Sequence, residues 1–210
     1  MKDFKFIFSL SALLFSFQIF AQDLMKKSDS LSTWELFKYD GVSIYKGIGD
    51  TYTAPLFWDK DDYITAAAVV GATAALYIFD EETSDYFIKQ KEDALTVVRD
   101  FGWYFGSPQN NYGITGAVYL YGLFTKNEKI RRTGVLMISA ATASGIIQSI
   151  SKAAIGRARP SAEEGKASFK PFNKEGSFHS FPSGHTILSF TTMYALSKQF
   201  KNPFVKAGLM

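Results

Sequence analysis

Residues 133–160 decide the fold, and they read TGVLMISAATASGIIQSISKAAIGRARP. Residues 133–151 contain no proline and predict a helix. Ala141, Ser144 and Gly145 within it are small, and small side chains let two helices approach closely. The stretch therefore predicts a helix built for close packing, followed by a basic segment that ends in proline.

Further apolar runs lie on both sides of this stretch. Residues 63–79, 113–124 and 185–200 predict helices, and residues 85–104 predict an amphipathic one. The sequence shows neither a persistent strand alternation nor an internal repeat. The predicted fold class is therefore all-α, a helical bundle.

Two connections separate these predicted helices. Gly102, Gly106 and Pro108 indicate a loop before residue 113. The basic run KNEKIRR at residues 126–132 indicates a connector.

Three acids precede the run at 63–79, namely Asp59, Asp61 and Asp62. Acids at this position are typical of a helix cap and first turn. We prefer that interpretation, and a calcium site is the alternative.

The chain of 210 residues divides into three predicted parts. Residues 1–21 pair a charged start with an apolar run and a small residue before a polar break, the pattern of a secretory signal peptide. The alternative is an uncleaved membrane anchor. Residues 22–60 predict an irregular segment with one short helix near residues 31–37, and residues 61–210 predict the bundle domain.

Composition excludes several classes of protein. The net charge of +3 is too small to indicate a nucleic-acid protein. Without cysteine, disulfides and thiolate sites are excluded, and two histidines cannot form a three-histidine zinc site. The apolar runs are Ala-rich or short for a membrane span, so a soluble bundle and a membrane-embedded bundle both stay open.

The basic segment carries the first candidate chemistry. Lys152 and Arg159 are seven residues apart, which would place them near one face of a helix that Pro160 stops. Two cations on one face predict a clamp for an anion, since Arg offers a planar fork to phosphate oxygens and Lys a point charge.

A second stretch, SFPSGHT at residues 180–186, begins twenty positions after Pro160. Ser183 is the natural N-cap of the helix that follows, and Gly184 lets the backbone come close to a ligand. The free N–H groups of that helix start would receive an anion. His185 stands beside them and could protonate a leaving oxygen.

Each of these residues alone has an ordinary explanation as a helix end, a cap or a surface side chain. Their combination at this spacing favours the functional interpretation. Arg157 is a lesser candidate for an auxiliary phosphate contact, and His179 is expected to be a loop residue.

Residues 152–160 and 180–185 resemble the first two of three motifs of the type 2 phosphatidic acid phosphatase superfamily. That superfamily also holds bacterial acid phosphatases and vanadium-dependent haloperoxidases. The resemblance implies a helical bundle and phosphate-ester hydrolysis through a phosphohistidine, without a metal or other cofactor. It implies that Lys152, Arg159, Ser183 and the Gly184 amide bind phosphate and that His185 is the general acid.

The sequence departs from the family at the third motif, which supplies the nucleophilic histidine. No histidine follows His185, so we expect this sequence to be part of a longer protein, with an inactive remnant as the alternative.

The expected function is an exported, envelope-located phosphatase whose substrate is a phosphorylated lipid or a small phosphomonoester. A non-catalytic protein that binds phosphate-bearing lipid is the alternative, and a haloperoxidase is a weaker one. A membrane is the expected partner, and nucleic acid is not.

Overall fold

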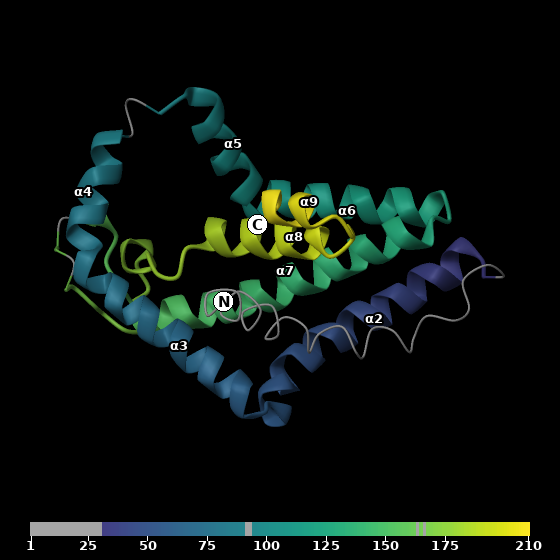
Figure 1. The fold of residues 1–210 in the computed structure, drawn as a ribbon, viewed down its shortest axis with the longest axis horizontal. Coiled ribbons are helices and arrows are strands. Elements are labelled where there is room, and N and C mark those ends of the chain that lie inside the picture. Colours follow the sequence, from purple (N-terminus) through teal and green to yellow (C-terminus); the bar gives the residue numbers. More distant parts are fainter. Residues whose placement is uncertain (1–30, 91–93, 163, 166) are drawn as a thin grey trace.

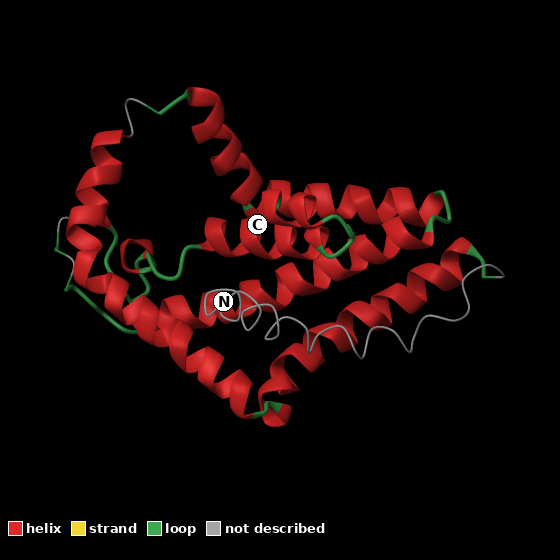
Figure 2. Cartoon of the chain, in the orientation of Figure 1, coloured by secondary structure: helices red, strands yellow, loops and turns green. Residues whose placement is uncertain are grey.

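The computed structural model describes residues 31–90, 94–162, 164–165 and 167–210. Helices dominate these residues (Figures 1 and 2), and in chain order they are α2 (Thr33–Thr53), α3 (Lys60–Leu76), α4 (Asp80–Gln90), α5 (Thr96–Gly106), α6 (Pro108–Phe124), α7 (Glu128–Ile155), α8 (Gly184–Ser197) and α9 (Pro203–Gly208). The described residues contain no strand beyond an isolated bridge between Arg157 and Phe169. The all-α prediction is confirmed.

Helix α7 is the centre of the bundle, with α6, α8 and α2 packed against it (Figure 1). Ala141 is fully buried, and Ser144 accepts a hydrogen bond from Thr191 of α8 over 3.4 Å. A Cβ at Gly134 would lie 2.5 Å from the Cα of Tyr119, so the α6–α7 contact requires a glycine there. The predicted close packing is therefore present at Ala141 and Ser144, whereas at Gly145 a Cβ would have no neighbour within 4 Å.

Residues 22–60 were predicted to be irregular, and for the described part that prediction is wrong because Thr33–Thr53 form α2. A capping box starts the helix: Ser32 Oγ accepts from the N–H of Glu35, whose carboxylate accepts from the N–H of Ser32. Leu36 is buried, and Gly47 lies against Ser139 of α7. Packing on α7 thus outweighs the low helix propensity of glycine. The predicted signal peptide lies outside the described residues.

Two predicted connections are shorter than expected. Helix α7 begins at Glu128, inside the basic run, because Asn127 Oδ1 accepts from the N–H of Ile130 as an N-cap. Helix α6 begins at Pro108, which suits the first position of a helix because proline lacks the N–H that would be unpaired there.

The helix predicted over residues 63–79 is present as α3 and a short 3₁₀ turn. Asp59 caps it, since Asp59 Oδ1 accepts from the N–H groups of Asp61 at 2.8 Å and Asp62 at 3.0 Å. The capping interpretation is confirmed. The amphipathic run at 85–104 is divided between α4 and α5.

Helices α3, α4 and α5 form a segment that extends away from the bundle, and α5 packs back against α8 (Figure 1). We call this segment the excursion. No residue of α3 is buried, although its sequence is almost wholly apolar after Tyr63. Two helical stretches of the described residues are long and apolar enough to cross a membrane by length and composition alone, 60–90 and 128–155.

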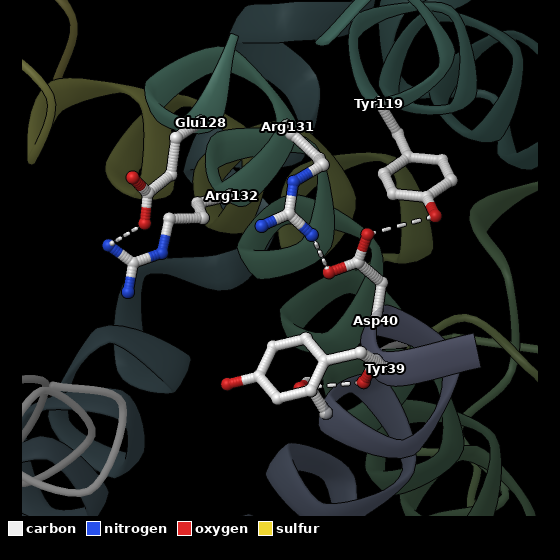
Figure 3. A network of polar contacts seen from close by, with 7 residues as sticks. Tyr39, Asp40, Tyr119, Glu128, Arg131 and Arg132 are labelled. Carbon is white, nitrogen blue, oxygen red and sulfur yellow. Dashed lines mark hydrogen bonds and ion pairs between the residues drawn. The ribbon is translucent and has the colours of Figure 1, made fainter. Parts of the chain in front are cut away.

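A buried polar network joins α2, α6 and α7 (Figure 3). The guanidinium of Arg131 pairs with Asp40, and Tyr119 Oη donates to the other carboxylate oxygen of Asp40 over 3.1 Å. Asp40 and Arg131 are 2% and 3% exposed, so water cannot replace either partner. Burial raises the pKa of Tyr119, and the carboxylate of Asp40 raises it further, so the phenol keeps its proton.

Asp40→Asn should lower the free energy of unfolding by about 3–5 kcal/mol, because it leaves the guanidinium of Arg131 buried without a counter-charge. The matched control is Glu128→Gln, which removes the partner of the neighbouring Arg132 at the surface. That control should change the free energy by less than about 0.5 kcal/mol. Urea unfolding followed by circular dichroism measures both, and equal losses would contradict the role given to Asp40.

Candidate functional site

The candidate site begins where α7 ends. Gly156 ends the helix with φ +60°, and a Cβ there would lie 2.0 Å from the carbonyl oxygen of Lys170. Only glycine fits such a left-handed position in contact with another strand of backbone. Arg159 therefore lies beyond α7, and the prediction that Lys152 and Arg159 share one helix face is wrong.

The charges of Lys152 and Arg159 nevertheless act on each other. Lys152 is half-buried in the last turn of α7 and Arg159 is exposed. Burial lowers the pKa of Lys152, and the nearby positive charge of Arg159 lowers it further. Among the residues that the structure describes, neither cation pairs with a carboxylate. An anion bound between them would relieve this repulsion.

Backbone hydrogen bonds hold the segment of Arg159 against the segment that leads to α8. The N–H of Arg159 donates to Ser177 O over 2.7 Å. Ser180 donates to Arg157 O from both its N–H at 3.1 Å and its hydroxyl at 3.0 Å. The two stretches singled out in the sequence therefore run side by side.

The start of α8 faces the end of α7. Ser183 is the N-cap, and its exposed Oγ accepts from the N–H of Thr186 over 3.4 Å. A Cβ at Gly184 would lie 3.3 Å from the side-chain amide of Gln148. Gln148 is one helical turn before Lys152, so the same face of α7 carries Lys152 toward the N-terminus of α8.

His185 lies in the first turn of α8, as predicted. Its Nε2 is buried and has no hydrogen-bond partner among the described residues. The indole of Trp103 stacks on its ring with 4.8 Å between ring centroids and 30° between planes. A Cβ at Gly106 would lie 2.8 Å from the Cβ of His185.

The sequence did not identify Trp103 or Gly106 as part of the site. Both lie on α5, but the sequence predicted an amphipathic helix at Trp103 and a loop at Gly106, and no local pattern relates them to His185. The tertiary contact between α5 and α8 brings them together.

Arg157 and His179 are occupied elsewhere. The guanidinium of Arg157 pairs with Asp80 of α4 and lies 5.6 Å from the ring centroid of Tyr77. His179 Nε2 lies 2.9 Å from Asn173 O. Arg157 therefore anchors the excursion to the bundle, and His179 is held within its loop.

The arrangement is suited to an oxyanion. Lys152 and Arg159 have no carboxylate partner among the described residues. Gln148 of α7 lies against the start of α8, which offers free N–H groups and the Ser183 hydroxyl. The imidazole of His185 stands at the same helix start, and its Nε2 has no hydrogen-bond partner in the part of the chain that the structure describes. Such a site can bind a phosphate group and exchange a proton with it.

Comparison with known proteins agrees with this chemistry. The model of the PAP2 superfamily matches residues 133–209, which include all five predicted site residues. Residues 133–209 are thus similar to the PAP2 superfamily, and the predicted resemblance is confirmed.

Two curated relatives are lipid A 1-phosphatases, from Rhizobium etli and Rhizobium johnstonii. Each is 40% identical to this chain over 67 residues, which is 30% of this chain. The matched part covers 29% of the first relative and 28% of the second. No solved structure matches the chain.

Gly156→Ala should lower the free energy of unfolding by at least about 1–3 kcal/mol, because alanine is strained at this φ and its Cβ would meet Lys170 O. The control is Gly145→Ala, on the same helix, where a Cβ has no neighbour within 4 Å. That variant should be neutral or more stable by up to about 1 kcal/mol. Thermal or urea unfolding compares the two, and equal effects would show that the turn is not the constraint.

Proposed function

We propose that the protein is a phosphatase that hydrolyses a phosphate monoester or diphosphate of a lipid. The observation that carries the proposal is that the charge of Arg159 acts on Lys152 at the end of α7, while Gln148, one turn before Lys152, lies against Gly184 at the start of α8. The family match and the relatives named as lipid A 1-phosphatases support it.

In this proposal Lys152 and Arg159 bind the phosphate oxygens. Ser183 Oγ already accepts from Thr186, and its hydroxyl proton is available to a phosphate oxygen. The N–H of Gly184 opens the helix, where backbone donors and the helix dipole favour an anion.

His185 is the proposed general acid. When the bond between phosphorus and the leaving oxygen breaks, the electron pair goes to that oxygen, and Nε2 of the protonated imidazole supplies the proton. The buried Nε2 has no hydrogen-bond partner within the described ranges, and the leaving oxygen would become one.

The proposed route passes through a phosphohistidine, so the attacking nitrogen belongs to a histidine other than His185, which is the proposed acid. His179 is a poor candidate because its Nε2 contacts Asn173 O. It also lies on the loop beside the proposed phosphate site, whereas in-line attack comes from the side opposite the leaving group.

The surface of the excursion supports a lipid substrate and an envelope location. Val69, Val70 and Leu76 of α3 are 46%, 68% and 69% exposed, so apolar side chains face outward on several sides of the helix. An open hollow of about 380 Å³ between α5 and α6 is lined in part by Phe101 and Ile114. Apolar surface of this extent marks a site that contacts lipid or another protein.

Arg159→Ala should lower kcat/KM by about 10²- to 10³-fold, because it removes one preorganised charge donor from the transition state. Phosphate release from a long-chain lipid phosphate in detergent micelles, with EDTA present, measures it in the intact protein. Orthovanadate should inhibit the wild type by occupying the proposed phosphate site, and the variant should bind it more weakly.

The matched control is Arg132→Ala, which removes a guanidinium paired with Glu128 near the opposite end of α7. It should leave kcat/KM unchanged. Near-wild-type activity of the Arg159 variant would end the proposal. Vanadate binding without any phosphate release would favour a non-catalytic protein that binds phosphate-bearing lipid.

His185→Ala should reduce the hydrolysis of alkyl phosphates far more than that of activated aryl phosphates, since a good leaving group needs no proton. Steady-state rates on one substrate of each kind, measured in the intact protein, give the comparison. Equal loss on both substrates would assign His185 a structural role instead.

A further inference from the structure

Helix α5 presents two residues to His185. Trp103 and Gly106 are three positions apart, so they lie on the same face of the helix. The indole of Trp103 stacks on the imidazole, and Gly106 lies against the backbone of His185. One face of α5 therefore meets both the ring and the main chain of the proposed acid.

Gly106 makes this approach possible. A Cβ at this position would lie 2.8 Å from the Cβ of His185 and 2.9 Å from its Cα, distances at which any other residue would collide. The absence of a side chain lets the end of α5 reach the first turn of α8, and this brings Trp103 within stacking distance.

A neighbouring contact fixes the end of α5 relative to α8. Only Ser107 separates α5 from α6. Asn111 in the first turns of α6 donates from Nδ2 to Thr192 Oγ1 of α8 over 2.8 Å, and both residues are buried. Thr192 is two turns after His185, so this hydrogen bond holds the α5–α6 junction along the face that carries the imidazole.

The orientation of a histidine ring is commonly fixed by a hydrogen bond at one of its nitrogens. Nε2 of His185 has no such bond among the described residues. The indole of Trp103 contacts the face of this ring, and a contact with the face does not use the hydrogen-bonding capacity of Nε2.

We propose that Trp103 is a positioning residue for this reaction: its indole holds the imidazole of His185 in the orientation that protonates the leaving group. The inference rests on the proposed function. It assigns a role to α5, which lies outside the segment that matches the family.

The stacking itself is tested by NMR with histidine labelled in the imidazole ring. Protons over an indole face are shifted upfield, so a ring proton of His185 should move downfield in Trp103→Leu and keep part of its shift in Trp103→Phe. The control is Trp34→Leu. Trp34 is exposed to a similar extent, 61% against 65% for Trp103, but it stacks on Phe37 and not on His185. The control should leave the His185 resonances in place.

The catalytic consequence is tested in the intact protein on an alkyl phosphate and an activated aryl phosphate. Trp103→Leu should lower kcat on the alkyl phosphate by about tenfold, with KM unchanged and little effect on the aryl phosphate, since only proton transfer is misaligned. Trp103→Phe should restore most of the rate because it restores an aromatic face. Circular dichroism confirms that each variant is folded.

If the wild type is active and Arg159→Ala is impaired, three outcomes would overturn the inference. These are unchanged kinetics in Trp103→Leu, equal losses on both substrates, and a rise in KM alone. A wild type that releases no phosphate would instead overturn the proposed function, and the catalytic role of Trp103 with it, even if the rings are stacked.

Discussion

The left-handed turn at Gly156 is the constraint on which the candidate site depends. It stops α7 three residues before Arg159, and Lys170 O lies where any side chain at Gly156 would have to be. The chain then runs beside residues 177–180, held by the hydrogen bond from Arg159 to Ser177. Without this turn α7 would continue, and Arg159 would be carried away from residues 177–180.

Ion pairing distinguishes three arginines with a structural role from Lys152 and Arg159. Arg131, Arg132 and Arg157 are paired with Asp40, Glu128 and Asp80, respectively. Lys152 and Arg159 have no carboxylate partner among the described residues, and the positive charge of Arg159 lowers the pKa of Lys152. A protein tolerates such repulsion in a partly buried place at a cost in stability, and a bound oxyanion offsets that cost.

The fold class and the helix caps could be predicted from the sequence because those signals are local, and the roles of the candidate site residues stay predictions. Ser183 caps α8 and Asp59 caps α3, as expected from the residues that follow each of them. The sequence did not predict α2, because the packing of Gly47 on α7 outweighs the weak helix propensity of glycine in that segment. It also failed to foresee the stacking of Trp103 on His185, because nothing near either residue indicates that α5 returns to α8.

The apolar excursion is fastened to the bundle at the two places where the proposed site is built. At one end Asp80 of α4 pairs with Arg157, two residues before Arg159. At the other end Gly106 and Trp103 of α5 lie against His185. A lipid that contacts the exposed side chains of α3 and α4 therefore contacts a segment joined to both the proposed phosphate clamp and the proposed acid. This continuity supports the proposal of a lipid substrate, because the surface that would bind its apolar part is joined to the proposed phosphate site by the same segment of chain.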